Sequence, residues 1–313
     1  MPAFKIIHVA VGVIINERQQ VLIAQRHQDS HKGGLWEFPG GKKEESESIE
    51  TALKREFAEE IGIEPTKFHP FTKILYHYPE KSVLLDVWRI TEFSGHAEGR
   101  EGQAIAWRPL EELQMWDFPE ANASIIKRLA LPTKIAITPD LETIDDLSSL
   151  ISQYGKLGIK LMQFRQTQLG QEKFDIWLRQ AISIAEEAGV QLVANQSPEF
   201  FDRSLSKGLH ANSKTLMALQ HRPVSTDSLF SASCHNLDEL QHAERIEADF
   251  VTLSPVCYTS KYGSNSELGW EKFAELAGQV SLPIYALGGI SLSDMSLALD
   301  HGAFGIAGIT PFL

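Results

Sequence analysis

The segment from residue 41 to residue 63 constrains the fold more than any other, because it joins a loop to a helix that is apolar on one side and acidic on the other. The apolar residues recur at spacings of three and four and predict a buried face: Ile49, Ala52, Leu53, Phe57 and Ile61. Glu56, Glu59 and Glu60 stand at i, i+3 and i+4 on the other face. Carboxylates this close repel each other, and a hard divalent cation such as Mg²⁺ or Mn²⁺ removes the repulsion. The segment predicts a metal-binding helix; the alternative is a solvated acidic face.

The spacing around this helix strengthens the first interpretation. Gly41 is followed after five residues by Glu47, and after seven more by the run from Arg55 to Ile63, which reads Arg-Glu-Phe-Ala-Glu-Glu-Ile-Gly-Ile. This arrangement resembles the signature of the Nudix hydrolases at every specified position. Gly62 stands where a C-terminal glycine cap is expected to end the helix.

Length and composition predict two soluble domains. The chain has 313 residues, of which 43% are hydrophobic, enough to build one or two cores. It contains no apolar run of membrane-spanning length and no charged-then-apolar leader at Met1, so we expect a cytoplasmic protein without membrane contact. Cys234 and Cys257 form no paired motif, which argues against a disulfide framework and a cysteine zinc site.

The net charge of -12 argues against binding of long nucleic acid, because such binding relies on lysine and arginine displacing phosphate counterions. Any nucleotide that this chain handles is therefore expected to be small and neutralised by metal ions.

The N-terminal part predicts a mixed sheet with flanking helices. Apolar, β-branched runs at 6–15 and 21–24, split by the polar residues 16–20, are typical of a hairpin. Further strands are expected at 74–78, 83–90 and 104–108, and a second helix at 121–129. The Leu131-Pro132-Thr133 segment interrupts this pattern. We therefore expect one domain over residues 1–131 and another over 132–313.

The C-terminal part alternates short apolar strands with helical stretches. The expected strands are 134–138, 159–165, 191–195, 208–211, 229–235, 250–254, 283–287 and 305–309. Eight strands alternating with helices predict a compact (β/α)₈ TIM barrel, with a doubly wound sheet as the alternative.

From about Ile7 to Leu129 the chain resembles the MutT-type Nudix hydrolases, α/β/α sandwich proteins that cleave nucleoside triphosphates, typically oxidised guanine nucleotides such as 8-oxo-dGTP, to the monophosphate and pyrophosphate. The stretches that match are Gln25–Arg26, Leu35–Lys42, Gly99–Gln103 and Phe118–Asn122. The resemblance implies a set of metal ligands: the carbonyl of Gly40 and the carboxylates of Glu56, Glu59, Glu60 and Glu101. It also implies that Arg55 pairs with the acidic residues and holds them in place, and that Glu47 supports the metal ligands without contacting the ion itself.

This set of metal ligands is suited to catalysing the attack of water on a triphosphate. Metal ions neutralise the phosphate oxygens and lower the pKa of a bound water, so that displacement at phosphorus becomes accessible near neutral pH. A carboxylate then takes the proton. Glu56 is the first candidate for this base and Glu101 the second.

The same resemblance suggests residues that hold the nucleotide. Asn122 offers a donor and an acceptor to a guanine edge, although an Asn at a helix start is also a common N-cap. Phe38 is a candidate pocket wall or a core residue, and Arg26 and Lys81 are candidates for contacts to nucleotide oxygens. His27 and His31 are interpreted as loop residues.

From about Lys134 to Leu313 the chain resembles thiamin phosphate synthase and its TenI relatives, most clearly in the stretch from Pro283 to Ile290. The Gly288-Gly289 turn and the glycine-rich segment 305–308, interpreted as a second turn, are candidates for a phosphate site at the top of a barrel. Two tight turns without a ligand are the alternative. Further positions that the resemblance assigns to ligand binding are Gln163, Arg165, Asn195, Thr259, Lys261 and Gly308.

The sequence departs from the synthase pattern at positions that matter for catalysis. Gln196 follows Asn195 where the synthases usually have aspartate, and the loop 210–214 lacks the second acidic metal ligand. The lysine expected soon after Arg165 is replaced by Gln166 or Thr167. A departing pyrophosphate without carboxylate-held Mg²⁺ is poorly stabilised. We therefore expect a barrel that binds a phosphorylated ligand, with a thiamin-pathway phosphate as the candidate, without making thiamin phosphate.

These features lead to one hypothesis and two alternatives. The leading hypothesis is an Mg²⁺-dependent (Mn²⁺ as the other candidate ion) pyrophosphohydrolase that removes oxidised nucleotides from the pool used for DNA replication. One alternative is a Nudix hydrolase of a thiamin-pathway pyrophosphate. The other is a barrel that acts as a non-catalytic regulatory module.

Overall fold

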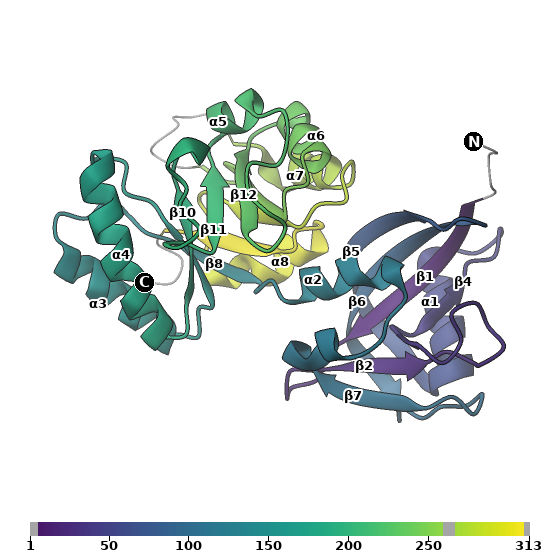
Figure 1. The fold of residues 1–313 in the computed structure, drawn as a ribbon. Coiled ribbons are helices and arrows are strands. Elements are labelled where there is room, and N and C mark those ends of the chain that lie inside the picture. The colour runs from purple at the N-terminus through teal and green to yellow at the C-terminus, as the bar shows by residue number, and fades with distance from the viewer. Residues whose placement is uncertain (1–5, 259–266, 310–313) are drawn as a thin grey trace. The chain divides into compact units, whose positions relative to one another are not determined.

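The computed structural model describes residues 6–258 and 267–309 and divides into two compact units, Met1–Ala130 and Leu131–Leu313 (Figure 1). Thr259 and Lys261, two of the candidate ligand-binding residues, lie outside the described residues.

The N-terminal unit contains two sheets. The first has the strand order β4-β1-β6-β5, and these strands are β4 (Gly40–Lys42), β1 (Ile6–Ile14), β6 (Ser82–Gly95) and β5 (Ile63–His77). Strands β1 and β6 run parallel and the other neighbours antiparallel, which confirms the predicted mixed sheet. The second sheet is antiparallel, in the order β3 (Trp36–Glu37), β2 (Gln20–Gln25) and β7 (Ile105–Pro109).

The predicted hairpin between β1 and β2 is wrong. The chain does turn there, because the side-chain carbonyl of Asn16 accepts hydrogen bonds from the backbone N–H groups of Arg18 and Gln20, both at 3.0 Å. A single bridge between Ile15 and Val21 then joins the two arms, after which each strand enters a different sheet. Both strands bury side chains on both faces, so the apolar pattern alone does not specify which strands pair.

The predicted metal-binding helix is present as α1 (Ile49–Glu56), which continues into a π-helical turn, η1 (Phe57–Ile61). The helix begins at Ile49, because the hydroxyl of Ser48 caps it and accepts a hydrogen bond from the backbone N–H of Thr51. Gly62 ends it at φ 76°, the left-handed conformation expected of a glycine cap.

The two helices of this unit cover opposite faces of the sheets, which confirms the predicted α/β/α sandwich. Leu53 and Phe57 of the first helix pack in one core with Ala10 and Ile14 of β1. Residues of α2 (Ala123–Leu129) pack in the other core, against the alternate β1 residues such as Val11. Short 3-10 segments, η2 (Leu110–Met115) and η3 (Glu120–Asn122), precede α2.

The C-terminal unit is a closed parallel barrel, as predicted, and closure excludes the doubly wound alternative. Its strands follow one another around the barrel as β8 (Lys134–Ile137), β9 (Leu161–Phe164), β10 (Gln191–Asn195), β11 (Gly208–Ala211), β12 (Leu229–Cys234), β13 (Phe250–Leu253), β14 (Ile284–Leu287) and β15 (Gly305–Gly308). Helices α3 (Ile144–Lys156), α4 (Gln171–Glu187), α5 (Ser213–Ala218), α6 (Leu237–Arg245), α7 (Gly269–Ala277) and α8 (Met295–Asp300) surround it. Two 3-10 turns, η4 (Pro198–Phe200) and η5 (Leu292–Asp294), complete the unit. The described segment between β10 and β11 holds only η4, which keeps the barrel small.

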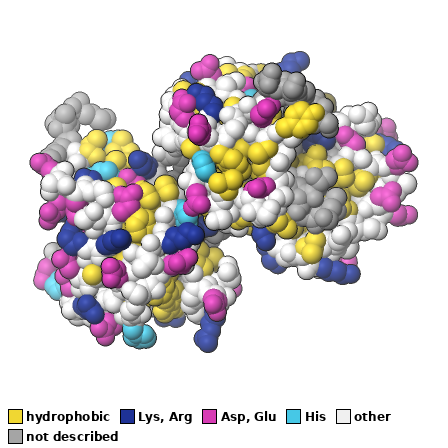
Figure 2. All heavy atoms as spheres, turned by 180° about the vertical axis from the view of Figure 1, so that it is seen from behind, with side chains coloured by type: hydrophobic (Ala, Val, Ile, Leu, Met, Phe, Trp, Pro, Cys, Tyr) yellow, Lys and Arg dark blue, Asp and Glu magenta, His cyan; other side chains and the backbone are white. Residues whose placement is uncertain are grey.

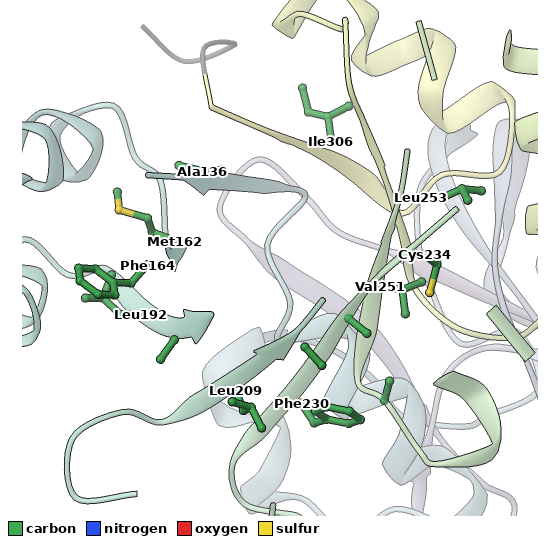
Figure 3. Close-up of a cluster of buried hydrophobic side chains, with 14 of the residues drawn as sticks. Ala136, Met162, Phe164, Leu192, Leu209, Phe230, Cys234, Val251, Leu253 and Ile306 are labelled. Atoms are coloured by element: carbon green, nitrogen blue, oxygen red, sulfur yellow. The ribbon is translucent and has the colours of Figure 1, made fainter. Parts of the chain in front are cut away.

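The barrel strands alternate between an apolar outer layer and an interior in which polar side chains such as His210 lie among apolar ones such as Leu161 and Phe250. Figure 3 shows outer-layer side chains from successive strands, among them Phe164, Leu209 and Phe230, which belong to one core with the surrounding helices. The alternate residues face the barrel interior. There His210 lies within 2.9 Å of the hydroxyls of Ser231 and Ser233. Burial, and secondarily the charge of Arg165, lowers the pKa of His210 to about 3, so this imidazole is neutral.

The surface shows no large basic area on the described face drawn in Figure 2, where lysine and arginine side chains are interspersed with acidic ones. None of the helices over the described ranges is both long and apolar enough to cross a membrane.

Candidate active site

The acidic face of the first helix lies against strand β4. The carboxylate of Glu56 is nearly buried and occupies the space where a side chain at residue 41 would stand, since a Cβ there would lie 2.2 Å from its Cδ. Gly40 precedes it in the left-handed region at φ 145°, and a Cβ there would lie 2.1 Å from the carbonyl oxygen of Ala10. The Gly-Gly pair thus brings the β4 backbone next to the Glu56 carboxylate.

Arg55 connects the loop before the helix to the acidic face. Its Nη2 lies 2.7 Å from Oε1 of Glu47, and its Nη1 lies 2.8 Å from Oε1 of Glu56 and 3.4 Å from Oε2 of Glu59. The hydrogen bond from Arg55 is the main reason why the pKa of Glu47 is lowered. The bonds to Glu47 and Glu56 raise the pKa of Arg55, so the guanidinium stays charged. One cation therefore holds three of the predicted site carboxylates in place.

Glu60 and Glu56 lie in an environment that disfavours their negative charge. Burial, followed by the charges of Glu56 and Glu101, raises the pKa of Glu60 to about 8. Burial also raises the pKa of Glu56, although Arg55 opposes this. An uncompensated cluster of this kind favours a bound cation, because the cation supplies the missing positive charge.

The donor chemistry of this cluster fits a hard divalent cation, but the ligands are not assembled in advance. Over residues 6–258 and 267–309, no three carboxylate, histidine or cysteine side chains stand close enough to enclose one ion. Glu59 has a side chain that is 59% exposed, and Glu101 is exposed on a loop. A single ion held by all four carboxylates would require these two side chains to turn toward Glu56 and Glu60.

The raised pKa of Glu60 predicts how the stability of the metal-free protein depends on pH. Between its ordinary pKa of 4.5 in the unfolded chain and about 8 in the folded one, the folded state keeps a proton that the unfolded chain has released. The free energy of unfolding is therefore expected to fall as the pH rises through this window. Melting temperatures at pH 5 and pH 8 with a chelator measure this fall. Glu60→Gln should show a smaller fall, and equal falls in both proteins would contradict the prediction.

A cavity of about 380 Å³ opens beside the acidic face. Glu60 and Glu101 line it together with Gly40, and so do all four residues predicted to hold the nucleotide: Arg26, Phe38, Lys81 and Asn122. The structure thus places residues from two segments of the acidic site, and four residues that are far apart in the sequence, around one cavity.

Asn122 lies in the wall of this cavity and is only 7% exposed. It stands at the N-cap of α2, yet among the described residues its side chain makes no capping hydrogen bond. The N-cap alternative is therefore not realised. Phe38 is both a pocket wall and a core residue, because it stacks on Phe118 with ring centroids 5.5 Å apart and is 2% exposed.

Arg26 and Lys81 line the cavity but have partners within the protein. Arg26 donates from Nε to the carbonyl of His31 at 2.9 Å and forms an ion pair with Glu37. Burial raises the pKa of Glu37 to about 7 against the opposing charge of Arg26. The ammonium of Lys81 lies 5.9 Å from the ring centroid of Tyr78.

His31, Tyr78 and Gln103 also line the cavity, although the sequence predicts no ligand role for them. His31 contacts the Tyr78 ring edge to face at 5.0 Å, and its Nδ1 lies 3.2 Å from Oε1 of Glu80. Tyr78 lies on a segment with no motif of its own, so no sequence signal pointed to it. Gln103 stands two residues beyond Glu101 in a matched stretch, which was the available signal.

The candidate residues of the second unit gather at one end of the barrel. Its strands are parallel, so Arg165 after β9, Asn195 at the end of β10, Gly288 after β14 and Gly308 at the end of β15 all lie at the carboxyl edge. Gln163 is buried within β9.

The glycines at this edge have steric reasons of their own. Gly288 and Gly289 have φ values of 96° and 67°, and a Cβ on Gly289 would lie 2.4 Å from the carbonyl oxygen of Tyr258. Close approach of residues 255–258 thus accounts for this turn without a ligand. The interpretation of segment 305–308 as a turn is wrong: it is strand β15, where Gly305 leaves room for the carbonyl of Thr133.

The residues at the positions that depart from the synthase pattern make hydrogen bonds to other parts of the barrel unit. The amide nitrogen of Gln166 donates to the Pro139 carbonyl at 2.6 Å, and its oxygen accepts from the backbone of Leu141 at 3.0 Å. Gln196 accepts from Gln171 at 3.3 Å. Asn212 caps α5 by accepting from the backbone of Thr215 at 2.9 Å.

Comparison with known families gives two matches that divide the chain. A model of the NUDIX domain matches residues 10–128, and a model described as thiamine monophosphate synthase matches residues 135–312. The chain belongs to both families. Its N-terminal part is a Nudix hydrolase domain, and its C-terminal part is a thiamine monophosphate synthase-type barrel.

Individual relatives also match one domain each. An 8-oxo-dGTP diphosphatase of Escherichia coli is 40% identical to the Nudix domain over 125 residues, which are 40% of this chain and 97% of the relative. A CTP pyrophosphohydrolase of the same organism is 36% identical over 127 residues, 39% of this chain and 94% of the relative. A putative thiamine-phosphate synthase of Aquifex aeolicus is 28% identical to the barrel region over 188 residues, 59% of this chain and 100% of the relative.

Proposed function

We propose that the Nudix domain is an Mg²⁺-dependent pyrophosphohydrolase that hydrolyses 8-oxo-dGTP to 8-oxo-dGMP and pyrophosphate, and so removes oxidised nucleotides before DNA synthesis. The observation that carries this proposal is the cavity, because Glu60 and Glu101 line it together with Phe38 and Asn122. A nucleotide that places its base against Phe38 and Asn122 presents its phosphates toward the carboxylates. The relative named 8-oxo-dGTP diphosphatase supports this choice of substrate.

The metal ion would be held by the Gly40 carbonyl and by the carboxylates of Glu56, Glu59, Glu60 and Glu101. When bound, it neutralises phosphate oxygens and makes a bound water more acidic. Arg55 keeps Glu56 and Glu59 oriented, with Glu47 fixing the other side of its guanidinium.

Glu56 is the better base of the two candidates. Burial raises its pKa, which brings a carboxylate closer to the range in which it accepts a proton from water near neutral pH. Glu101 is exposed on its loop and is better suited to closing the site as a ligand. Turnover of Glu56→Gln is the measurement, and retained turnover would transfer the role of base to Glu101.

Asn122→Ala is expected to reduce the preference for 8-oxo-dGTP over dGTP by roughly tenfold to a hundredfold, because a buried amide that pairs with one base and not the other contributes about 1–3 kcal/mol. The measurement is kcat/KM for both nucleotides in the wild-type protein and the variant. Turnover of dGTP is the internal control, since phosphate chemistry should change less. An unchanged preference would remove Asn122 from base recognition.

A second candidate substrate follows from the relative named CTP pyrophosphohydrolase. CTP therefore belongs in the same panel, beside thiamin pyrophosphate and ADP-ribose. If any of these three is hydrolysed with a higher kcat/KM than 8-oxo-dGTP, the proposed substrate is wrong while the hydrolase family stands.

For the barrel we propose binding of a phosphorylated ligand of the thiamin pathway at its carboxyl edge without thiamin phosphate synthesis. Gln196, in place of an acid, supports the second half of this proposal, and so does Asn212, whose side chain is committed to a helix cap. Asp140 also lies at this edge and is an acidic residue. Its carboxylate is already engaged within the protein, because it accepts a hydrogen bond from the hydroxyl of Thr167 at 2.8 Å and lies 3.5 Å from the guanidinium of Arg165.

A further inference from the structure

The loop that carries Glu101 is fastened to the end of the metal-binding helix. The last carbonyls of a helix have no partner within it. Here the Glu60 carbonyl accepts from the backbone N–H of Arg100 at 2.9 Å, and the Ile61 carbonyl accepts from Glu98 at 2.9 Å. The guanidinium of Arg100 adds a bond of 3.1 Å to the carbonyl of Ala58. The loop thus caps the helix.

Gln103 ties the two halves of the acidic site together with a single side chain. Its amide nitrogen donates to the Glu60 carbonyl at 2.9 Å, and its amide oxygen accepts from the backbone N–H of Glu101 at 2.9 Å. A carbonyl and an N–H from segments 41 residues apart are therefore held at a fixed separation by one planar amide. Gly99 makes room for this arrangement, because a Cβ there would lie 2.0 Å from the Gln103 carbonyl oxygen.

We propose that Gln103 is a positioning residue for metal binding, which sets the place of Glu101 relative to Glu60. This inference rests on the proposed metal-dependent function. Glu101 is exposed and the described carboxylates do not form a finished site, so its backbone position decides whether its side chain reaches the ion. An alanine at 103 leaves the carboxylates in place but lets the Glu101 backbone move.

The test uses the full chain and two variants, Gln103→Ala and Arg100→Ala. Mn²⁺ binding is measured by the loss of the free-ion EPR signal, without substrate. Gln103→Ala is expected to weaken Mn²⁺ binding about tenfold or more, the usual effect of removing a group that orients a ligand. The Mg²⁺ concentration for half-maximal turnover should rise by a similar factor, while KM for the nucleotide at saturating Mg²⁺ changes by less than about twofold.

Arg100→Ala is the matched control, because it removes another bond between the same loop and the same helix but leaves the Gln103 amide in place. It should lower the melting temperature and leave Mn²⁺ affinity within about twofold of wild type. Unchanged Mn²⁺ binding in Gln103→Ala would overturn the inference, and so would equal weakening in both variants. If Mn²⁺ binding is weakened in Gln103→Ala as expected but the wild-type protein hydrolyses none of the nucleotides, the inference stands and the proposed function fails.

Discussion

Glu60→Gln is expected to lose about three orders of magnitude in turnover of 8-oxo-dGTP while the protein remains folded. Glu60 lies in the cavity wall, and burial together with the charges of Glu56 and Glu101 raises the pKa of its carboxyl to about 8. Replacing it by an amide of the same shape removes a negative ligand. A metal ion contributes several kcal/mol to such a transition state, and each 1.36 kcal/mol is a tenfold change in rate.

The same substitution should not reduce stability in the absence of metal, because an amide removes the cost of keeping this carboxyl protonated in the folded state at neutral pH. Turnover at millimolar Mg²⁺ and the melting temperature with a chelator are the two measurements. Glu111→Gln is the matched control, since this exposed glutamate of η2 is not among the residues that line the cavity. Turnover near the wild-type value in Glu60→Gln would refute the metal-site assignment.

Glu59→Gln provides a graded comparison within the same site. Glu59 is more exposed than Glu60, and Arg55 contacts it only at 3.4 Å. Its loss should still cost turnover heavily, but its effect on the stability of the metal-free protein should be smaller than that of Glu60→Gln.

Expression of this chain in a bacterial strain that lacks thiamin phosphate synthase is expected to give no growth without thiamin. The barrel has the closed parallel strands and the glycine turn expected for its family, but Gln196 stands where an acid would hold Mg²⁺ for pyrophosphate departure. At the second acidic position the expected loop 210–214 is not present, because the chain passes directly from β11 into α5 through the cap residue Asn212 and supplies no carboxylate there. The side chains of Gln196 and Asn212 already make hydrogen bonds within the protein, so in this arrangement they are not available as metal ligands.

Residues 133–313 alone should nevertheless fold and bind a phosphate-bearing ligand at Gly288-Gly289. The described barrel is closed and has its own core, which includes Phe164 and Phe230 (Figure 3). Titration of this fragment with inorganic phosphate, thiamin phosphate and thiamin pyrophosphate measures binding, and thiamin, which carries no phosphate, is the control ligand. In the growth assay, a known synthase expressed in the same strain is the positive control. Growth of the strain that expresses this chain at an ordinary level would show that the barrel has other metal ligands. In the titration, absence of binding to all three phosphate compounds would remove the phosphate site.

Much of the architecture could be predicted from local patterns. The strands of the barrel were expected where they occur, because each is a short apolar run between polar helices and parallel strands are buried on both faces. Strand β5 was expected only at 74–78 but spans Ile63–His77, with register irregularities near Pro65, Lys67 and Pro70. Its first half is polar and contains prolines, so its pairing with β6 is decided by the neighbouring strand.

The candidate site divides in the same way. The signature located Glu56, Glu59, Glu60 and Arg55 because these residues share one helix, where spacing alone determines which side chains are neighbours. Glu101, Phe38 and Asn122 were assigned through resemblance, and their placement around one cavity depends on how β3, the 98–103 loop and η3 pack. Nothing in the local pattern indicated that Tyr78 and His31 form part of that wall.

The sequence by itself determined the strands of the barrel, the two families and the acidic face, since these depend on periodicity, spacing and motifs within a segment. Only the tertiary structure decided that β1 and β2 enter different sheets, that Asn122 makes no helix cap and that Gln103 joins Glu60 to Glu101. It also decided that close backbone packing accounts for the glycine turn of the barrel. The physical reason is common to all four. A hydrogen-bonding group or a glycine is equally suited to several partners, and the choice among them is made by residues that are distant in the chain and brought near by folding.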